Sequence, residues 1–304
     1  MKQALRDKWR LGAGFGVAMA IWLLTGVAMA RDLDGLLKKT ADKDGYVAAT
    51  IEETRRSEEL FVRLLRGERE EDIQQDLTEL GFMLDQVQAG PDTLTVIRES
   101  EDRRTGKGLY VFRNDPTKMV LLQAPHRFKD LDTGTIVARI MEESGFAAAA
   151  WNTVPRWYDE DGHRVDADLS HTRTSHFNAF TRAFIRVHPG GQVAQLHGFD
   201  PDKRDSAAGR SASIVVSSGT KDPGSAATGA AACLKSMLRA EKTLLYPLDI
   251  QELGATTNTN GAEMRSLDST AFVHLEVARD LRKWLRKDAD LRRVLIDCLT
   301  EKEF

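Results

Sequence analysis

The chain has 304 residues, of which 41% are hydrophobic and 29% are charged, and its formal net charge is −3. This length is enough for one large domain and a smaller element. The acidic balance argues against nucleic acid as a partner, because phosphate binding relies on a basic surface.

Residues 1–30 have the pattern of a secretory signal. Four basic residues are followed by the apolar stretch LGAGFGVAMAIWLLTGV and by a small-x-small motif that ends at Ala30. We expect cleavage after Ala30, a periplasmic or secreted protein and no later membrane span; a retained membrane anchor over residues 11–29 is the alternative. Cleavage removes four of the 43 basic and one of the 46 acidic residues, which leaves 39 against 45.

Residues 31–90 are predicted to form an N-terminal helical segment ahead of an α/β domain over residues 91–304. Within residues 33–88, apolar side chains recur at spacings of three and four, in two runs that each end at a glycine. We interpret the segment as a helical pair packed on the main domain. A docking arm for an envelope partner is the alternative.

From residue 93 the apolar period changes to two. TLTVIRE and GLYVFRND flank a polar, glycine-containing segment and predict a β-hairpin, and KMVLLQAP predicts the next strand. Strands and helices then alternate to residue 300. This pattern predicts an α/β fold with a mixed, largely parallel central sheet and helices on both faces. In such sheets, ligands bind beyond the carboxyl ends of the strands.

Three predicted strands end in residues of metal-binding or acid–base type. His126 follows one strand, His197 ends a second, and Glu276 ends a third. The period of two places Gln195 beside His197, and His274 beside Glu276, on one face of their strands. A buried sheet would otherwise have aliphatic side chains at these positions.

Catalytic zinc typically takes three protein ligands, and a separate carboxylate then moves the proton of the attacking water. The strand ends therefore favour a Zn²⁺ site made of His126, an aspartate of the same loop (Asp130 or Asp132) and His197, with Glu276 as the base. Each residue also has a structural interpretation: a turn contact for His126, a helix cap for either aspartate, and a helix start for Glu276.

Cys233 and Cys298 are the only cysteines, and both lie in predicted C-terminal helices. Export permits a disulfide between them, and two unpaired buried thiols are the alternative. Their spacing is not that of a zinc cluster or a CxxC redox motif.

Four motifs, PHRFKDLDTGT, LSHTRTSHFNAF, QLHGF and VHLEVARDLR, occur in this order over about residues 90–290. Together they resemble the bacteriophage-type poly-γ-glutamate hydrolases, zinc peptidases related in fold to zinc carboxypeptidases and N-formylglutamate amidohydrolases. The resemblance implies that His126 and His197 are zinc ligands and that Glu276 is the catalytic glutamate. The DTGT motif favours Asp132 over Asp130 as the carboxylate ligand.

The chain departs from the family pattern in two places. Arg127, Phe128 and Lys129 stand where the family usually has glycines, and the loop looks about one residue longer. His274 stands where the family commonly has Gln. These departures bear on the identity of the carboxylate ligand and on the surroundings of the catalytic glutamate.

The resemblance also suggests pocket residues. His171 and His176 match two family histidines five apart, while Arg156 and Arg265 are candidates for a substrate carboxylate by position alone. With His274, these residues are the expected substrate-binding set. A polar first turn for the helix from residue 175 is the alternative role of the two histidines.

The predicted function is that of an exported zinc-dependent amidohydrolase or peptidase. Its substrate would be a peptide or polyglutamyl chain with a glutamyl-type amide bond, including γ-linked ones. The rival is a non-catalytic envelope protein that binds a ligand or metal and kept the hydrolase fold; the altered first motif and the extra helices favour it. The sequence leaves the oligomeric state open.

Overall fold

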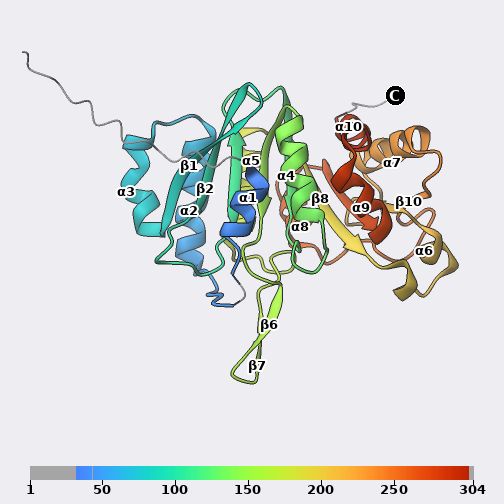
Figure 1. Cartoon of the computed structure of the whole chain (residues 1–304), viewed down its shortest axis with the longest axis horizontal. Helices are drawn as coiled ribbons and strands as arrows, with labels where there is room; N and C mark the ends of the chain where they lie inside the picture. Colours follow the sequence, from blue (N-terminus) through green and yellow to red (C-terminus); the bar gives the residue numbers. More distant parts are fainter. Residues whose placement is uncertain (1–31, 43, 301–304) are drawn as a thin grey trace, which may run out of the picture.

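The computed structural model describes residues 32–42 and 44–300 of the chain (Figure 1). The predicted signal, its cleavage site and the alternative anchor lie outside the described residues. Among the residues that are described, no helix combines the length and the apolar character needed to span a membrane.

The N-terminal segment contains three helices, α1 (Leu33–Lys39), α2 (Ile51–Leu65) and α3 (Glu70–Leu80). A capping box starts α2, in which Thr50 and Glu53 each accept from the other's backbone N–H. Gly81 ends α3 with φ 73°, a left-handed conformation that glycine adopts at little cost. The chain then turns into a strand.

The predicted second helix, which ran to residue 88, is therefore wrong beyond Leu80. Residues after Gly81 form β1 (Phe82–Ala89), which pairs antiparallel with β2 (Asp92–Glu99). The predicted domain boundary at residue 90 falls in the tight turn between these strands. Since α1 packs on α4 (Thr133–Glu143) and α2 on α5 (His176–Val187), residues 32–90 belong to the same folded unit as the rest.

A mixed sheet of nine strands forms the centre of the described structure, in the order β1-β2-β3-β5-β4-β8-β11-β9-β10. The remaining strands of this sheet are β3 (Leu109–Arg113), β4 (Lys118–Ala124), β5 (Phe146–Trp151), β8 (Gln192–Phe199), β9 (Ile214–Ser217), β10 (Thr243–Leu245) and β11 (Phe272–Ala278). The central strands β5, β4, β8 and β11 run parallel, whereas β1, β2 and β3 are antiparallel. The predicted α/β class is confirmed.

Helices cover both faces of this sheet. One face packs against α1, α4, α7 (Ser225–Met237), α9 (Arg279–Lys287) and α10 (Ala289–Cys298), through a core that includes Leu122, Leu196 and Leu275. The other packs against α2, α3, α5 and α8 (Thr259–Ser266), through Leu121, Val193 and Phe272. Phe177, Phe180 and Phe184 of α5 lie in this second core, fully buried.

Several short elements, β10 and α8 among them, were not predicted from the sequence. A hairpin of β6 (Trp157–Glu160) and β7 (His163–Asp166) follows β5 and projects from the body (Figure 1). A 3₁₀ turn (Pro201–Lys203) and α6 (Ala207–Ser211) follow β8.

Cys233 on α7 and Cys298 on α10 are joined by a disulfide, with Cα atoms 5.3 Å apart. The structure therefore contains the disulfide, and the alternative of two unpaired thiols is wrong.

Candidate metal and proton-transfer site

The site lies at the carboxyl ends of β4, β8 and β11, on the face covered by α5 and α8. Side chains of this face form layers across the strands. Leu121, Val193 and Phe272 make an apolar layer. One step further, Gln123, Gln195 and His274 make a polar layer, and Glu276 then pairs in register with His197. Along β8 and β11, the side chains of this face change from apolar to ionisable within two steps.

His126 and Asp130 lie on the loop that leaves β4. The N–H groups of Lys129 and Asp130 both donate to the carbonyl of His126 at 2.9 Å, which closes one helical turn. Residues four apart in such a turn face the same side. The His126 and Asp130 side chains therefore approach each other.

His126, Asp130 and His197 form the cluster that we call the His–Asp–His group. Asp130 Oδ2 lies 3.6 Å from His126 Nδ1 and 3.4 Å from His197 Nδ1. A tetrahedral ion with bonds of about 2.1 Å to its ligands separates them by about 3.4 Å, so both distances fit a zinc-sized ion. All three residues are buried. The donor set and its spacing fit a divalent metal.

The outward nitrogens of both imidazoles have acceptors. His126 Nε2 lies 2.8 Å from Asp168 Oδ1, and His197 Nε2 lies 3.3 Å from Gln195 Oε1. Ligand histidines usually donate their second N–H in this way, which leaves the other nitrogen free for the metal. In both rings, that arrangement directs Nδ1 toward Asp130.

The orientation of Gln195 is set from outside the site. Asn258 caps α8 by accepting from Gly261 N–H, so its Nδ2 must face Gln195 Oε1, at 2.6 Å. Gln195 Nε2 donates to Gln123 Oε1 at 2.8 Å. Gln195 can therefore only accept from His197, which assigns the proton of this ring to Nε2.

The charges of the group are strongly coupled. Burial opposes the charged form of His126, but Asp168 and Asp130 outweigh burial and raise its pKa to about 9. Burial also opposes the charged forms of Asp130 and Asp168, yet the histidines hold the pKa of each carboxyl well below its usual range. Burial lowers the pKa of His197. The two carboxylates thus stabilise positive charge at this point.

Glu276 is a carboxyl group of a different kind. Burial, and then the charge of Asp130, raise its pKa to about 8. Its Oε2 is buried and has no hydrogen-bond partner among the described residues. A carboxyl with these properties can hold or release a proton near neutral pH, as a general acid–base group must.

His274, a member of the polar layer, lies beside both His197 and Glu276. Its ring centroid is 4.4 Å from that of His197, and its Nε2 is 3.9 Å from Glu276 Oε1. His197, His274 and Glu276 are close enough to form a second candidate ligand set. However, His274 Nδ1 is buried without a partner within the described structure, unlike the outward nitrogens of His126 and His197. The His–Asp–His group is the better built of the two.

Asp132, which the sequence motif favoured as the carboxylate ligand, lies outside the group. It stands at the start of α4 with φ 73°, and its carboxylate faces Arg286 Nε at 3.2 Å. Asp130, the alternative, is the aspartate beside the imidazoles. The reason is the turn at His126, which brings the fourth residue onto the same side but not the sixth.

The other sequence-predicted residues are dispersed. His171 lies at the edge of the site, with Nδ1 3.2 Å from Asp168 Oδ2 and Nε2 3.0 Å from Thr257 Oγ1. His176 is not a pocket residue of this site, because it is buried between α5 and α2, 2.7 Å from Ser57 Oγ. Arg156 follows β5 and is half-buried, and Arg265 is exposed on α8.

Asp168, Asn258 and Arg282 are site residues that the sequence did not single out. Asp168 lies in an irregular segment after β7, where no periodicity marks it. In the sequence, Arg282 looks like an ordinary surface arginine of α9. In the structure, its exposed fraction is only 5%. The period of two predicted the correct face of β8 for Gln195, but the sequence assigned no role to this residue.

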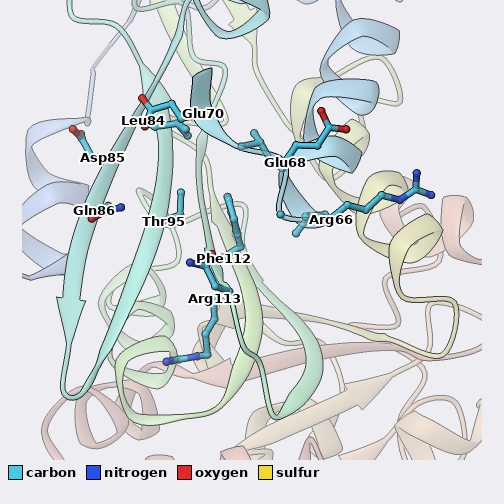
Figure 2. Close-up of a pocket in the computed structure, with 13 residues that line it drawn as sticks. Arg66, Glu68, Glu70, Leu84, Asp85, Gln86, Thr95, Phe112 and Arg113 are labelled. Atoms are coloured by element: carbon cyan, nitrogen blue, oxygen red, sulfur yellow. The ribbon is translucent and has the colours of Figure 1, made fainter. Parts of the chain in front are cut away.

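A cavity of about 600 Å³ lies elsewhere, over β1, β2 and β3 and beside the end of α2 (Figure 2). Leu64, Leu84, Phe112 and the charged residues Glu68 and Arg113 are among its lining residues. The lining contains no histidine and none of the residues of the His–Asp–His group.

No family model matches the chain, and no curated protein matches its sequence. Similar solved structures include a gene product of Agrobacterium tumefaciens (12% identity, 60% of this chain and 88% of the other, TM-score 0.38). A candidate carboxypeptidase A from Shewanella denitrificans (12%, 77% and 68%, TM-score 0.37) and an aspartoacylase family protein from Mesorhizobium loti (14%, 74% and 69%, TM-score 0.38) are also similar. At these TM-scores and identities, nothing about the activity of this chain follows from them.

Proposed function

We propose that this chain is an exported, zinc-dependent amidohydrolase or peptidase that cleaves glutamyl-type amide bonds, including γ-linked ones. One observation carries the proposal: the His–Asp–His group has the spacing of a tetrahedral metal site and lies beside the Glu276 carboxyl, whose Oε2 is buried without a hydrogen-bond partner among the described residues. Two imidazoles and one carboxylate are a common ligand set of catalytic zinc.

When bound, zinc supplies a Lewis acid that polarises a carbonyl and makes water more acidic. The chain itself supplies the proton transfer. Glu276 would accept the proton of the attacking water and return it to the leaving nitrogen, because its carboxyl lies beside His197 at the strand ends and its Oε2 has no other hydrogen-bond partner among the described residues. Asp168 and Gln195 hold the two imidazoles in the orientation that directs Nδ1 inward.

The substrate class rests on the sequence resemblance and on two arginines that each have an unsatisfied N–H group. A glutamyl substrate carries a carboxylate, which a guanidinium binds in bidentate fashion. Arg156 and Arg204 each have a buried Nε without a hydrogen-bond partner among the described residues. The charge of Arg204 also acts on Glu276. Both are candidates for holding the substrate carboxylate.

Export is proposed from residues 1–30 and supported by the cysteines. Disulfides persist in oxidising compartments and are rare in the cytosol. The bridge between Cys233 and Cys298 is what a periplasmic or secreted protein would contain.

Metal content and turnover, measured on one preparation, test the proposal. We expect one zinc per chain by elemental analysis and hydrolysis of α- or γ-glutamyl amides that a chelator abolishes. His197→Ala should lose both. A chain that binds zinc but cleaves none of these substrates would instead be a non-catalytic binding protein, and one that binds no metal would overturn the zinc site.

A further inference from the structure

Arg282 is a buried cation near the site, and the proposed reaction does not use it. Its side chain extends from the first turn of α9 to the ends of two strands and the loop after β4. Nε donates to the carbonyl of Leu131 at 2.8 Å, and Nη1 donates to those of Phe199, at 3.3 Å, and Val277. No carboxylate lies within ion-pair distance of it in the described part of the chain.

Each of these three carbonyls lies next to a residue of the site. Leu131 directly follows Asp130, Val277 directly follows Glu276, and Phe199 is two residues after His197. The three segments come from distant parts of the sequence. One guanidinium therefore links the backbone that carries the metal-binding group to the backbone that carries the general base.

Gly198 provides the space for this contact. A Cβ atom at this position would lie 2.2 Å from Nη1 and 2.4 Å from Cζ of Arg282. No side chain other than hydrogen fits there while the guanidinium stays in place. This explains why a glycine follows His197 within a strand, where glycine is otherwise unfavourable.

Arginine suits this role better than lysine. Its planar fork can donate to several acceptors in fixed directions, whereas a lysine ammonium is a single point charge on a flexible chain. The charge also lies close enough to influence both Asp130 and Glu276. A neutral or shorter side chain would leave two strand-end carbonyls and one loop carbonyl without this donor.

We propose that Arg282 is a positioning residue that sets the relative placement of the His–Asp–His group and Glu276. Its effect on catalysis rests on the proposed function, whereas its effect on the geometry does not. Replacing it should therefore change the environment of His126 and His197 even in the metal-free protein.

The test compares Arg282→Lys and Gly198→Ala with Arg113→Lys. Arg113 is a matched control because it is also buried and also donates to several carbonyls, those of Met141, Ser144 and Phe146, away from the site. The readouts are the imidazole ¹⁵N chemical shifts of the metal-free protein, the Zn²⁺ dissociation constant, and kcat and KM on a glutamyl amide.

We expect both site variants to shift the His126 and His197 resonances and to weaken zinc binding by about 10–100-fold, the range typical of changes around metal ligands. Arg113→Lys should lower the melting temperature without either effect. Equal resonance shifts and equal zinc affinities in all three variants would overturn the positioning role. If the wild type binds no zinc, the proposed function fails, and the histidine resonances still decide the role of Arg282.

Discussion

Single residues decide the chemistry of the loop after β4. Asp130 and Asp132 are two positions apart, yet Asp130 lies beside two imidazoles and Asp132 lies beside Arg286. The difference follows from the backbone turn at His126, whose carbonyl accepts from Asp130 N–H. Two carboxyls of the same kind therefore have different environments and different expected roles.

Asp130→Asn should weaken zinc binding by more than about tenfold, because the neutral amide is a poor ligand and adds no negative charge to balance that of the metal. Asp132→Asn should leave the affinity unchanged, since its carboxylate faces a half-exposed arginine. Isothermal titration with Zn²⁺ measures both. Loss of binding in Asp132→Asn alone would mean that the loop rearranges around the metal.

Glu276→Gln should abolish most hydrolysis while zinc content stays at the wild-type level. General acid–base assistance is worth about 10²–10⁴-fold in rate. Glutamine keeps the shape of the side chain but cannot carry the proton. Full zinc with near-normal turnover would show that another group is the base.

The same variant should make the metal-free protein more stable at pH 8. In the folded state the pKa of Glu276 is raised to about 8, so folding favours the protonated form. Its unfavourable contribution appears as the pH rises from about 4.5 to 8, because the unfolded chain ionises first. Glutamine removes this contribution. Melting curves of the metal-free wild type and variant at pH 5 and pH 8 measure this contribution. A lower melting temperature for the variant than for the wild type at pH 8 would contradict the prediction.

Among the elements, α2 and α5 show how a histidine can serve packing instead of catalysis. His176 begins α5, contacts Ser57 on α2 and meets the Phe82 ring edge-on at 5.5 Å. Burial lowers its pKa to about 4. The interface between these helices therefore requires the neutral imidazole.

Protonation of His176 should destabilise the fold in acid. Since its pKa is about 4 when folded and about 6.5 when unfolded, the unfolded state binds more protons between these values. The contribution is fully present above pH 6.5 and is lost as the pH falls toward 4, by roughly 2–4 kcal/mol in total. His176→Gln keeps a hydrogen-bonding group and should show a weaker pH dependence in urea unfolding. An equal change of the unfolding free energy with pH in the two proteins would contradict this prediction.

At the scale of the whole molecule, helices from both ends of the described chain enclose one sheet. Helices α2 and α3 cover one end of it, and the disulfide ties α7 to α10 at the other (Figure 1). This bridge closes a loop with a sequence separation of 65. The site lies between these regions, on the central parallel strands.

Removal of the disulfide should lower stability without affecting the site. Loop-closure entropy gives roughly 4 kcal/mol for a loop of this size. Cys233→Ser/Cys298→Ser should therefore melt lower than the wild type by roughly 10 °C, with an unchanged zinc affinity. Calorimetry of the double variant, with the reduced wild type as the control, measures it. An unchanged melting temperature would show that the bridge constrains neither state.

The sequence alone determined the α/β class, the parallel centre of the sheet, and the strand ends that bear His126, His197 and Glu276. These follow from local periodicity and from the rule that the ends of parallel strands meet at one edge. Only the tertiary structure decided between Asp130 and Asp132, assigned Asp168 and Arg282 to the site, and removed His176 from it. The physical reason is that these choices depend on a backbone turn and on contacts between distant segments, which leave no periodic trace in the sequence.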